Sequence, residues 1–542
     1  MPCDLSCFLA QTMPLWKLYQ HLPVAVFVFA FGAIVGSFIN VVIYRLPAGM
    51  SVISPPSRCP TCGARLSWRE NLPILGWFLV RGRCTHCQAK VSPQYMIIEL
   101  IMAMIFLGLY AAYYMAGPRV AWWGSVGGDW WYYNWVFRTS PAFIAHAFLL
   151  AALVAMTVID ARTFTIPPQI PLAVVLVAFI AYPVQAMLPA VPRAGGLWPI
   201  PAADWRWFAV ACGGMLGLVL SNILLKLRWL RYSFADYTDH LPSDRQDEGI
   251  SADRVTAFEL FCLLPVFIGL VAGPLVGPWI AVGLVVVVSG TVMLVGRLRG
   301  MDFGPASQRA SEQVIAPDYP HARREMGVEL LFLLPCVLGL AGGFFSGAWL
   351  PAGPPPNVVQ AMGGTFLGYL VGAGLIWAVR IIGTLSFGRE AMGLGDVHLL
   401  GAVGAVVGCV DPIFVFLLAP FFGLAWAFVS MGVASLFRRA RRELPFGPHL
   451  ALATLVVLLY RPAINWVQEW YTPWLSQPGL VGSAPAISPA TPQLTPKPAG
   501  DSAEQVLVGP AAAGQRRRVG VKLPAAMLRA GGTRQVSVNR LR

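Results

Sequence analysis

Apolar runs of about 20 residues recur along most of the chain and restrict what it can fold into. A run of that length spans the hydrocarbon core of a bilayer as an α-helix, because a helix rises about 1.5 Å per residue. The 542 residues are 57% apolar and only 12% charged. We therefore expect an all-α polytopic membrane protein with about 12 transmembrane helices.

The basic residues indicate how these helices are oriented. The formal net charge is +14, and Lys and Arg are concentrated in loops between the apolar runs. Cytoplasmic loops of membrane proteins carry such an excess of Lys and Arg. Basic and aromatic residues are not interleaved as in nucleic-acid-binding proteins, so lipid is the expected partner and nucleic acid is not. The run 22–44 has no small-residue cleavage site, so we expect it to stay in place as the first transmembrane helix.

Four cysteines in the loop that follows have the spacing of a metal site. Cys59 and Cys62 form one pair, Cys84 and Cys87 the other, with 21 residues between the pairs. Four thiolates close a tetrahedral structural zinc site and leave no open position for catalysis. Two disulfides are the alternative, but a basic and therefore cytoplasmic loop lies in a reducing compartment, which favours metal.

Two aspartates lie at the ends of apolar segments. Asp396 follows Gly393 and Gly395 where a short apolar helix begins, and Asp160 ends a longer apolar run. A carboxylate at the edge of the hydrocarbon is costly and indicates function. The positive-inside rule puts both at the cytoplasmic face, where each is either an independent helix cap or one half of a pair. Paired carboxyl groups share a proton and can activate water against a peptide bond, as in aspartic proteases.

Changes in composition divide the chain into seven parts. The predicted parts are an N-terminal segment (1–21), the first helix (22–44), the cytoplasmic tetracysteine module (45–95), a membrane core with Asp160 (96–230), an inserted segment with about three further transmembrane helices (231–360), a membrane core with Asp396 (361–474) and a disordered tail rich in Pro, Ala and Gly (475–542).

Several motifs together carry a family resemblance. They are Gly36-Ser37-Phe38-Ile39-Asn40-Val41-Val42-Ile43-Tyr44-Arg45-Leu46-Pro47, the tetracysteine module beginning Cys59-Pro60-Thr61-Cys62, Ile159-Asp160 with Ile166-Pro167, Gly393-Leu394-Gly395-Asp396-Val397, and Pro445-Phe446-Gly447-Pro448. Their order and spacing resemble the prepilin peptidases, or type IV leader peptidases, in the Gly-x-Gly-Asp class of membrane aspartic proteases.

The resemblance implies a multi-pass enzyme of the bacterial inner membrane. It would remove the leader from type IV prepilins or pseudopilins and methylate the new N-terminus with S-adenosylmethionine. By this resemblance Asp160 and Asp396 are the catalytic pair, and Gly393, Gly395 and Pro167 support the site. The residues that bind S-adenosylmethionine are not assigned.

The sequence departs from the family at two positions and leaves other functions open. Pro168 stands where the family usually has Asp or Asn, and His398 where it usually has Lys. The inserted segment 231–360 has no counterpart in short family members. The alternatives are a proton-coupled transporter and a pilus or secretion assembly factor without catalysis.

Overall fold

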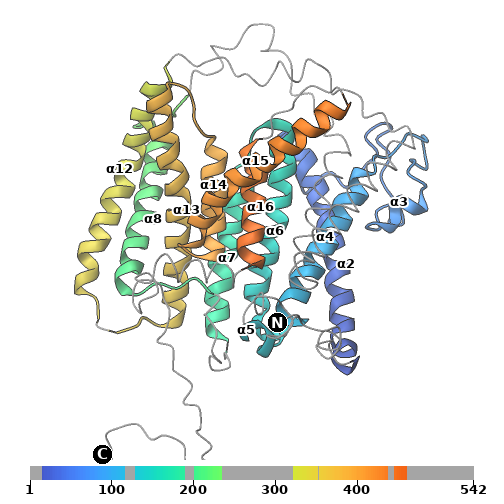
Figure 1. Cartoon of the computed structure of the whole chain (residues 1–542), viewed down its shortest axis with the longest axis horizontal. Coiled ribbons are helices and arrows are strands. Elements are labelled where there is room, and N and C mark those ends of the chain that lie inside the picture. The colour runs from blue at the N-terminus through green and yellow to red at the C-terminus, as the bar shows by residue number, and fades with distance from the viewer. Residues whose placement is uncertain are drawn as a thin grey trace, which may run out of the picture. The chain divides into compact units, whose positions relative to one another are not determined.

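The regular structure of the chain is helical throughout the part described. The computed structural model describes residues 15–115, 129–188, 200–234, 321–351, 353–437 and 445–460. The helices are α2 (Leu15–Arg45), α3 (Leu75–Leu79), α4 (Gln94–Tyr110), α5 (Asp129–Tyr133), α6 (Val136–Thr163), α7 (Gln169–Met187), α8 (Trp205–Lys226), α12 (Ala322–Ser346), α13 (Asn357–Phe387), α14 (Leu394–Val407), α15 (Asp411–Phe437) and α16 (Phe446–Leu459) (Figure 1). A π-helical turn, Ala111–Met115, extends α4.

Eight helices within the described residues are long and apolar enough to cross a membrane. Helices α14 and α16 are apolar but shorter, at 14 residues each. These ten account for ten of the about 12 spans expected from the sequence. The other two expected spans, near 257–272 and 278–295, lie outside the described residues, as does the tail 475–542, so the count of 12 stays a prediction.

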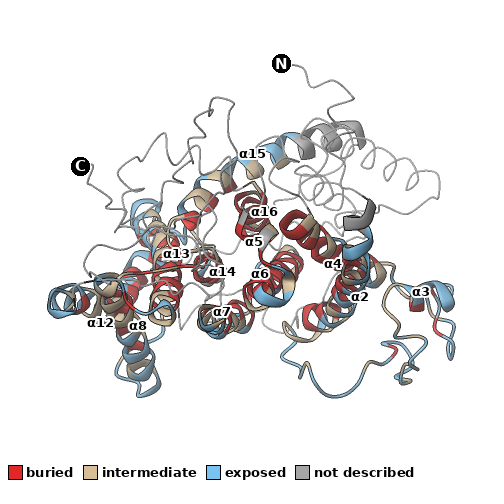
Figure 2. Ribbon diagram, turned by 90° about the horizontal axis from the view of Figure 1, so that it is seen from below, coloured by how far each residue is buried: buried red, intermediate tan, exposed pale blue. Residues whose placement is uncertain are grey.

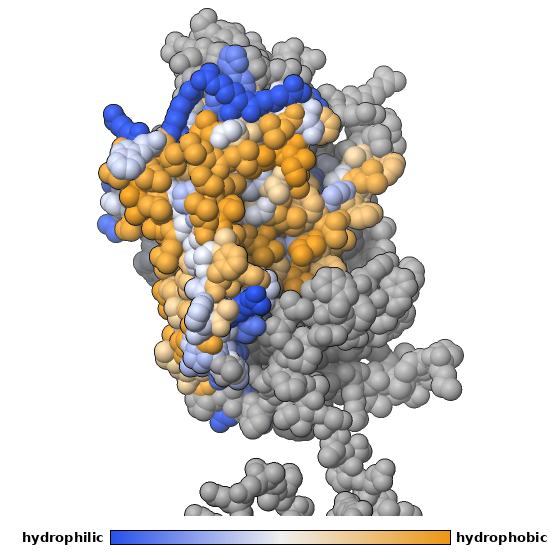
Figure 3. All heavy atoms as spheres, turned by 90° about the vertical axis from the view of Figure 1, so that its left-hand side faces the viewer, coloured by the Kyte–Doolittle hydropathy of each residue, from blue (hydrophilic) through white to orange (hydrophobic). Residues whose placement is uncertain are grey.

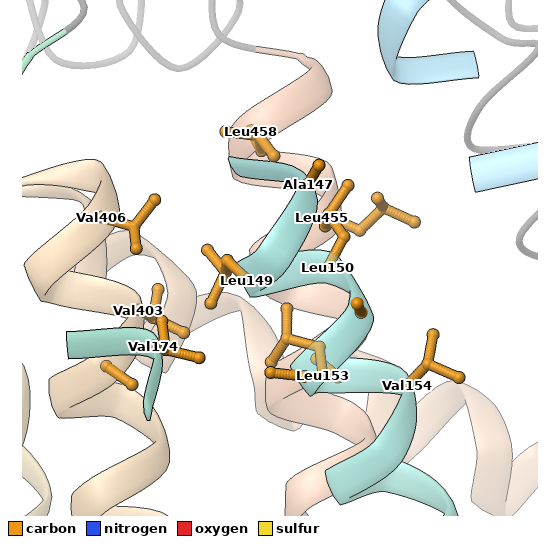
Figure 4. Close-up of a cluster of buried hydrophobic side chains, with 14 of the residues drawn as sticks. Ala147, Leu149, Leu150, Leu153, Val154, Val174, Val403, Val406, Leu455 and Leu458 are labelled. Atoms are coloured by element: carbon orange, nitrogen blue, oxygen red, sulfur yellow. The ribbon is translucent and has the colours of Figure 1, made fainter. Parts of the chain in front are cut away.

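Helix α6 forms the centre of the packed core. In its most apolar stretch 89% of the residues are buried, against 17% for the span Ala322–Trp349 that contains α12. Figure 2 shows the buried residues concentrated on the inner helices, with α12 at one edge. One buried cluster joins three helices: it contains Leu149, Leu150 and Leu153 of α6, Val403 of α14 and Leu455 of α16 (Figure 4). The helix that carries Asp160 is thus held on several sides by its neighbours.

The outer face of α12 is apolar and exposed. Its uncovered side chains are Leu330, Leu331, Leu334, Val337 and Leu338. The face of the molecule that carries α8 and α12 shows a broad hydrophobic band, bounded at one end by hydrophilic atoms (Figure 3). An exposed apolar surface of this extent is expected to face lipid, since in water it would drive association.

Glycines bring several helix pairs into backbone contact. On α13, a Cβ at Gly368 would lie only 2.0 Å from the carbonyl oxygen of Gly404 on α14. On α8, a Cβ at Gly213 would lie 2.0 Å from the carbonyl oxygen of Gly339 on α12. Small residues let membrane helices approach closely enough for van der Waals attraction between backbones. The position of α14, and therefore of Asp396, depends on this contact with α13.

A pair of alanine substitutions in α13 tests that contact. We expect Gly368→Ala to destabilise the protein by about 1–3 kcal/mol, because the methyl group must push α14 away. Gly374→Ala is the matched control: nothing lies within 4 Å of its added Cβ, so its stability should equal or exceed that of the wild type. Thermal unfolding in detergent measures both. Equal melting temperatures for the two variants would contradict the close contact.

Candidate active site

Asp160 lies in the last turn of α6 and is 5% exposed. The helix ends three residues later, where Phe164 adopts the left-handed conformation and its N–H donates to the Asp160 carbonyl oxygen at 2.8 Å. The chain then turns through Ile166 and Pro167 into α7. This turn folds Ile166, which is buried, back beside the Asp160 side chain.

Asp396 lies in the first turn of α14 and is 9% exposed. Gly393 precedes the helix in an extended conformation, and its carbonyl oxygen accepts the Asp396 N–H at 3.2 Å. Gly393 and Leu394 are themselves exposed. A buried carboxyl group therefore sits directly behind an accessible stretch of backbone.

The fold brings these two aspartates together from segments far apart in the sequence. Helices α6 and α14 pack against each other, with Asp160 in the last turn of the first and Asp396 in the first turn of the second. Ile166 links them: it contacts Gly395, next to Asp396, and Gly447, which touches Asp160. Two carboxyl groups brought close together do not both ionise easily, and such a pair can share one proton.

A third segment, the start of α16, completes the site. Gly447 lies directly against the Asp160 carboxyl group. A Cβ at Gly447 would lie 2.5 Å from Asp160 Oδ2. The sequence indicated Gly447 only as part of a family motif, and nothing in its spacing showed that it meets Asp160. Only glycine fits at position 447, because any side chain there would collide with the Asp160 carboxyl group.

The predicted support residues have different surroundings. A Cβ at Gly395 would lie 2.8 Å from the Ile166 Cβ, so packing requires glycine there. A Cβ at Gly393 would meet Asp396 Oδ2 at 3.6 Å, an ordinary contact. Pro167 is partly buried and its carbonyl oxygen accepts the Ile170 N–H, which starts α7. All three lie beside the aspartates, as expected from the motifs.

The two residues that depart from the family pattern border the site. His398 lies one turn into α14, and its Nδ1 is 3.3 Å from the Tyr369 hydroxyl of α13. Pro168 is exposed at the N-terminus of α7. His398 therefore packs between helices, whereas Pro168 lies on the surface near the aspartates.

The four loop cysteines form a separate cluster. Their sulfur atoms all lie within 4.8 Å of one another, with Cys59–Cys87 at 3.8 Å and Cys62–Cys84 at 4.0 Å. A tetrahedral zinc site with Zn–S bonds of about 2.3 Å has sulfur atoms about 3.8 Å apart, so the donor set fits a metal. No disulfide joins these four, which excludes the paired-disulfide alternative in this structure.

Each cysteine pair sits on a tight turn of the same design. The Cys59 N–H donates to the Ala64 carbonyl oxygen at 2.9 Å, and the Cys84 N–H to that of Ala89 at the same distance. Backbone N–H groups of Cys62 and Thr61 point at the Cys59 sulfur and lower the pKa of its thiol to about 6. Donors of this kind favour the thiolate that a metal needs.

Glu70 joins the two turns. It accepts hydrogen bonds from the Thr85 hydroxyl, beside Cys84, and from the Ser67 N–H at 2.7 Å. These bonds, chiefly that from Thr85, lower the pKa of the Glu70 carboxyl group to about 2. The loop is also tied to α4, because the Ile74 N–H donates to the Glu99 carboxylate at 2.7 Å.

Comparison with known proteins finds similarity over part of the chain. Residues 30–113 match the family model described as the bacterial peptidase A24 N-terminal domain. The chain is 34% identical over 143 residues to a prepilin leader peptidase/N-methyltransferase of Myxococcus xanthus, covering 26% of this chain and 36% of that protein. The protein of the same name in Neisseria gonorrhoeae is 31% identical over 198 residues, which cover 31% of this chain and 61% of that protein.

A Vibrio cholerae protein of that name is 42% identical over 85 residues, covering 14% of this chain and 34% of that protein. The chain thus spans between about a third and three fifths of the length of these relatives. No solved structure matches the chain. The family model and the relatives agree with the resemblance to the prepilin peptidases that the motifs carry.

Proposed function

We propose that this chain is an intramembrane-type aspartic endopeptidase that removes the leader of type IV prepilins or pseudopilin-like proteins. The observation that supports the proposal is the packing of α6 on α14, with Ile166 lying between the segments that carry Asp160 and Asp396, two buried carboxyl groups. The names of the relatives supply the substrate class. The inner membrane of a bacterium is the proposed location.

Asp160 and Asp396 share one proton in the proposed reaction. The ionised carboxylate takes a proton from water, whose oxygen attacks the peptide carbonyl, while the protonated carboxyl group donates a hydrogen bond to the carbonyl oxygen. The tetrahedral intermediate collapses when the leaving amine is protonated by the pair. Gly447 packs directly against the Asp160 carboxyl group, which restricts the movement of one member of the pair during this exchange.

The surroundings of Asp396 suit a substrate that leaves the membrane as an extended chain. Gly393 and Leu394 are exposed beside the buried carboxyl group. The absence of a side chain at Gly393 lets a substrate backbone approach closely. A prepilin, cut before an apolar helix, would present such a segment at the interface between lipid and water.

The tetracysteine module would hold a structural zinc ion on Cys59, Cys62, Cys84 and Cys87. We expect about one zinc per chain, and loss of most of it in Cys62→Ser, because three thiolates leave the tetrahedron incomplete. His86→Ala is the control: His86 is exposed within the second turn and should be dispensable for the metal. Elemental analysis of the purified variants decides this. Undiminished zinc in Cys62→Ser would rule out the four-cysteine site.

N-methylation of the new N-terminus with S-adenosylmethionine is the second activity we propose. It rests on the names of the relatives, which include an N-methyltransferase. S-adenosylmethionine would supply the methyl group, and no residue of this chain is assigned to bind it.

One experiment tests both activities. A type IV prepilin is co-expressed with the wild-type chain and its N-terminus is analysed by mass spectrometry. We expect a shortened N-terminus carrying one added methyl group. A shortened but unmethylated product would remove the methyltransferase from the proposal, and an intact leader would contradict the peptidase and favour an assembly factor.

A further inference from the structure

Helix α12 lies in the inserted segment 231–360 and carries a buried carboxylate, Glu329, that faces α13. Glu329 is 3% exposed and Arg380 of α13 is 2% exposed. The Arg380 Nη2 donates to Glu329 Oε1 at 2.9 Å, and its Nε donates to Glu329 Oε2 at 3.1 Å. This two-pronged geometry is the strongest arrangement that an arginine and a carboxylate can form. Trp377 adds an N–H bond to Glu329 Oε2 at 2.8 Å.

The remaining arm of the guanidinium points at the segment that carries Asp396. Nη1 donates to the Met392 carbonyl oxygen and to the Glu390 carboxylate. Met392 directly precedes Gly393, whose carbonyl oxygen accepts the Asp396 N–H. The Arg380 charge also acts on the Asp396 carboxyl group. One planar group thus connects the inserted helix to the backbone that holds Asp396.

The chemistry of the pair explains why Glu329 matters for this connection. A guanidinium is always charged, and burying it without a partner is costly, so it would turn toward other acceptors. Of its two carboxylate partners, Glu329 is buried whereas Glu390 is exposed. Glu329 is therefore the partner that compensates the buried charge and fixes the plane of the guanidinium.

We propose that Arg380 is a positioning residue for Asp396 and that Glu329, from the inserted helix α12, holds it in place. The inserted segment is then part of the machinery that aligns the aspartate pair. This inference rests on the proposed peptidase function.

The test uses the full-length protein in detergent, with a purified prepilin as substrate. The variants are Glu329→Gln, Arg380→Gln, both together, and Glu325→Gln as the matched control. Glu325 lies one turn earlier on α12 and is equally buried, but it accepts the Phe234 N–H at 2.9 Å and lies 3.9 Å from Arg231. Comparison of Glu325→Gln with Glu329→Gln separates the effect of removing any buried carboxylate from the effect of removing Glu329.

We expect Glu329→Gln and Arg380→Gln each to lower kcat roughly ten- to a hundredfold, with KM within about threefold, because misplacing a catalytic group impairs the chemical step more than binding. The double variant should be no slower than Arg380→Gln, since Glu329 acts through Arg380. Glu325→Gln should stay within about twofold of the wild type. Hydrogen exchange of the 388–396 amides should accelerate in the first two variants and not in the control.

Wild-type kcat in Glu329→Gln would overturn the proposal. Equal losses of kcat in Glu325→Gln and Glu329→Gln would do the same, since they would show a general packing role. If Arg380→Gln does not fold, Arg380→Lys replaces it, and the decision rests on Glu329→Gln. If the wild type itself cuts no prepilin, the peptidase function fails. The exchange of the 388–396 amides then decides alone whether Glu329 orders this segment.

Discussion

Asparagine at either Asp160 or Asp396 should lower the rate of leader cleavage by about a thousandfold or more. The amide cannot take a proton from water and cannot share one with its partner, and acid–base catalysis of this kind contributes about 10²–10⁴ in rate. Each single change should therefore be as damaging as the double change, because the carboxyl groups act as a unit. Cleavage of purified prepilin by the purified variants measures this.

Asp411→Asn is the matched control for both substitutions. Asp411 is a buried acid of the same helical core and is 2% exposed. It starts α15, after the end of α14, whereas Asp396 lies at the start of α14. We expect it to retain cleavage within a few fold of the wild type. If Asp411→Asn were as inactive as Asp160→Asn, the loss would reflect burial of a carboxyl group in the core and not membership of the pair.

Gly447→Ala should have the second-largest effect, a loss of cleavage of about a hundredfold. The added methyl group would lie 2.5 Å from Asp160 Oδ2 and must displace either that carboxyl group or the start of α16. A shift of about 1 Å in a catalytic group is enough for a loss of this size. The same assay measures it, at matched amounts of folded protein.

Gly423→Ala, on α15 where it packs against α16, controls for that substitution. A Cβ at Gly423 would lie 3.6 Å from the His449 ring, an ordinary contact, so both fold and activity should survive. Full activity in Gly447→Ala would show that the Asp160 carboxyl group does not depend on this close approach.

Local sequence patterns were enough to predict the parts of the site that lie within single segments. The cysteine pairs were found from their spacing, and Asp160 and Asp396 from the cost of an acid at a membrane boundary. Asn40, part of the first-helix motif, is buried and donates to the Tyr95 carbonyl oxygen at 2.9 Å.

Contacts between distant helices could not be predicted in the same way. Glu329 and Arg380 are 51 residues apart and meet only because α12 packs on α13. Arg380 did carry a signal, since an arginine within an apolar span indicates a functional partner, but its sequence neighbours do not identify that partner. Gly447 is similar: its role depends on α16 starting beside the end of α6, which no local pattern encodes.

Cross-linking tests most directly whether residues 160 and 396 face each other. Asp160→Cys and Asp396→Cys are combined in one variant, and membranes that contain it are treated with a short bifunctional thiol-reactive cross-linker. Linked peptides are then identified by mass spectrometry. We expect a 160–396 link and none in a variant with cysteines at 160 and 411, since α14 separates 396 from 411 by about 20 Å. If both cysteines reacted with a monofunctional reagent but never became linked, the aspartates would not be a pair.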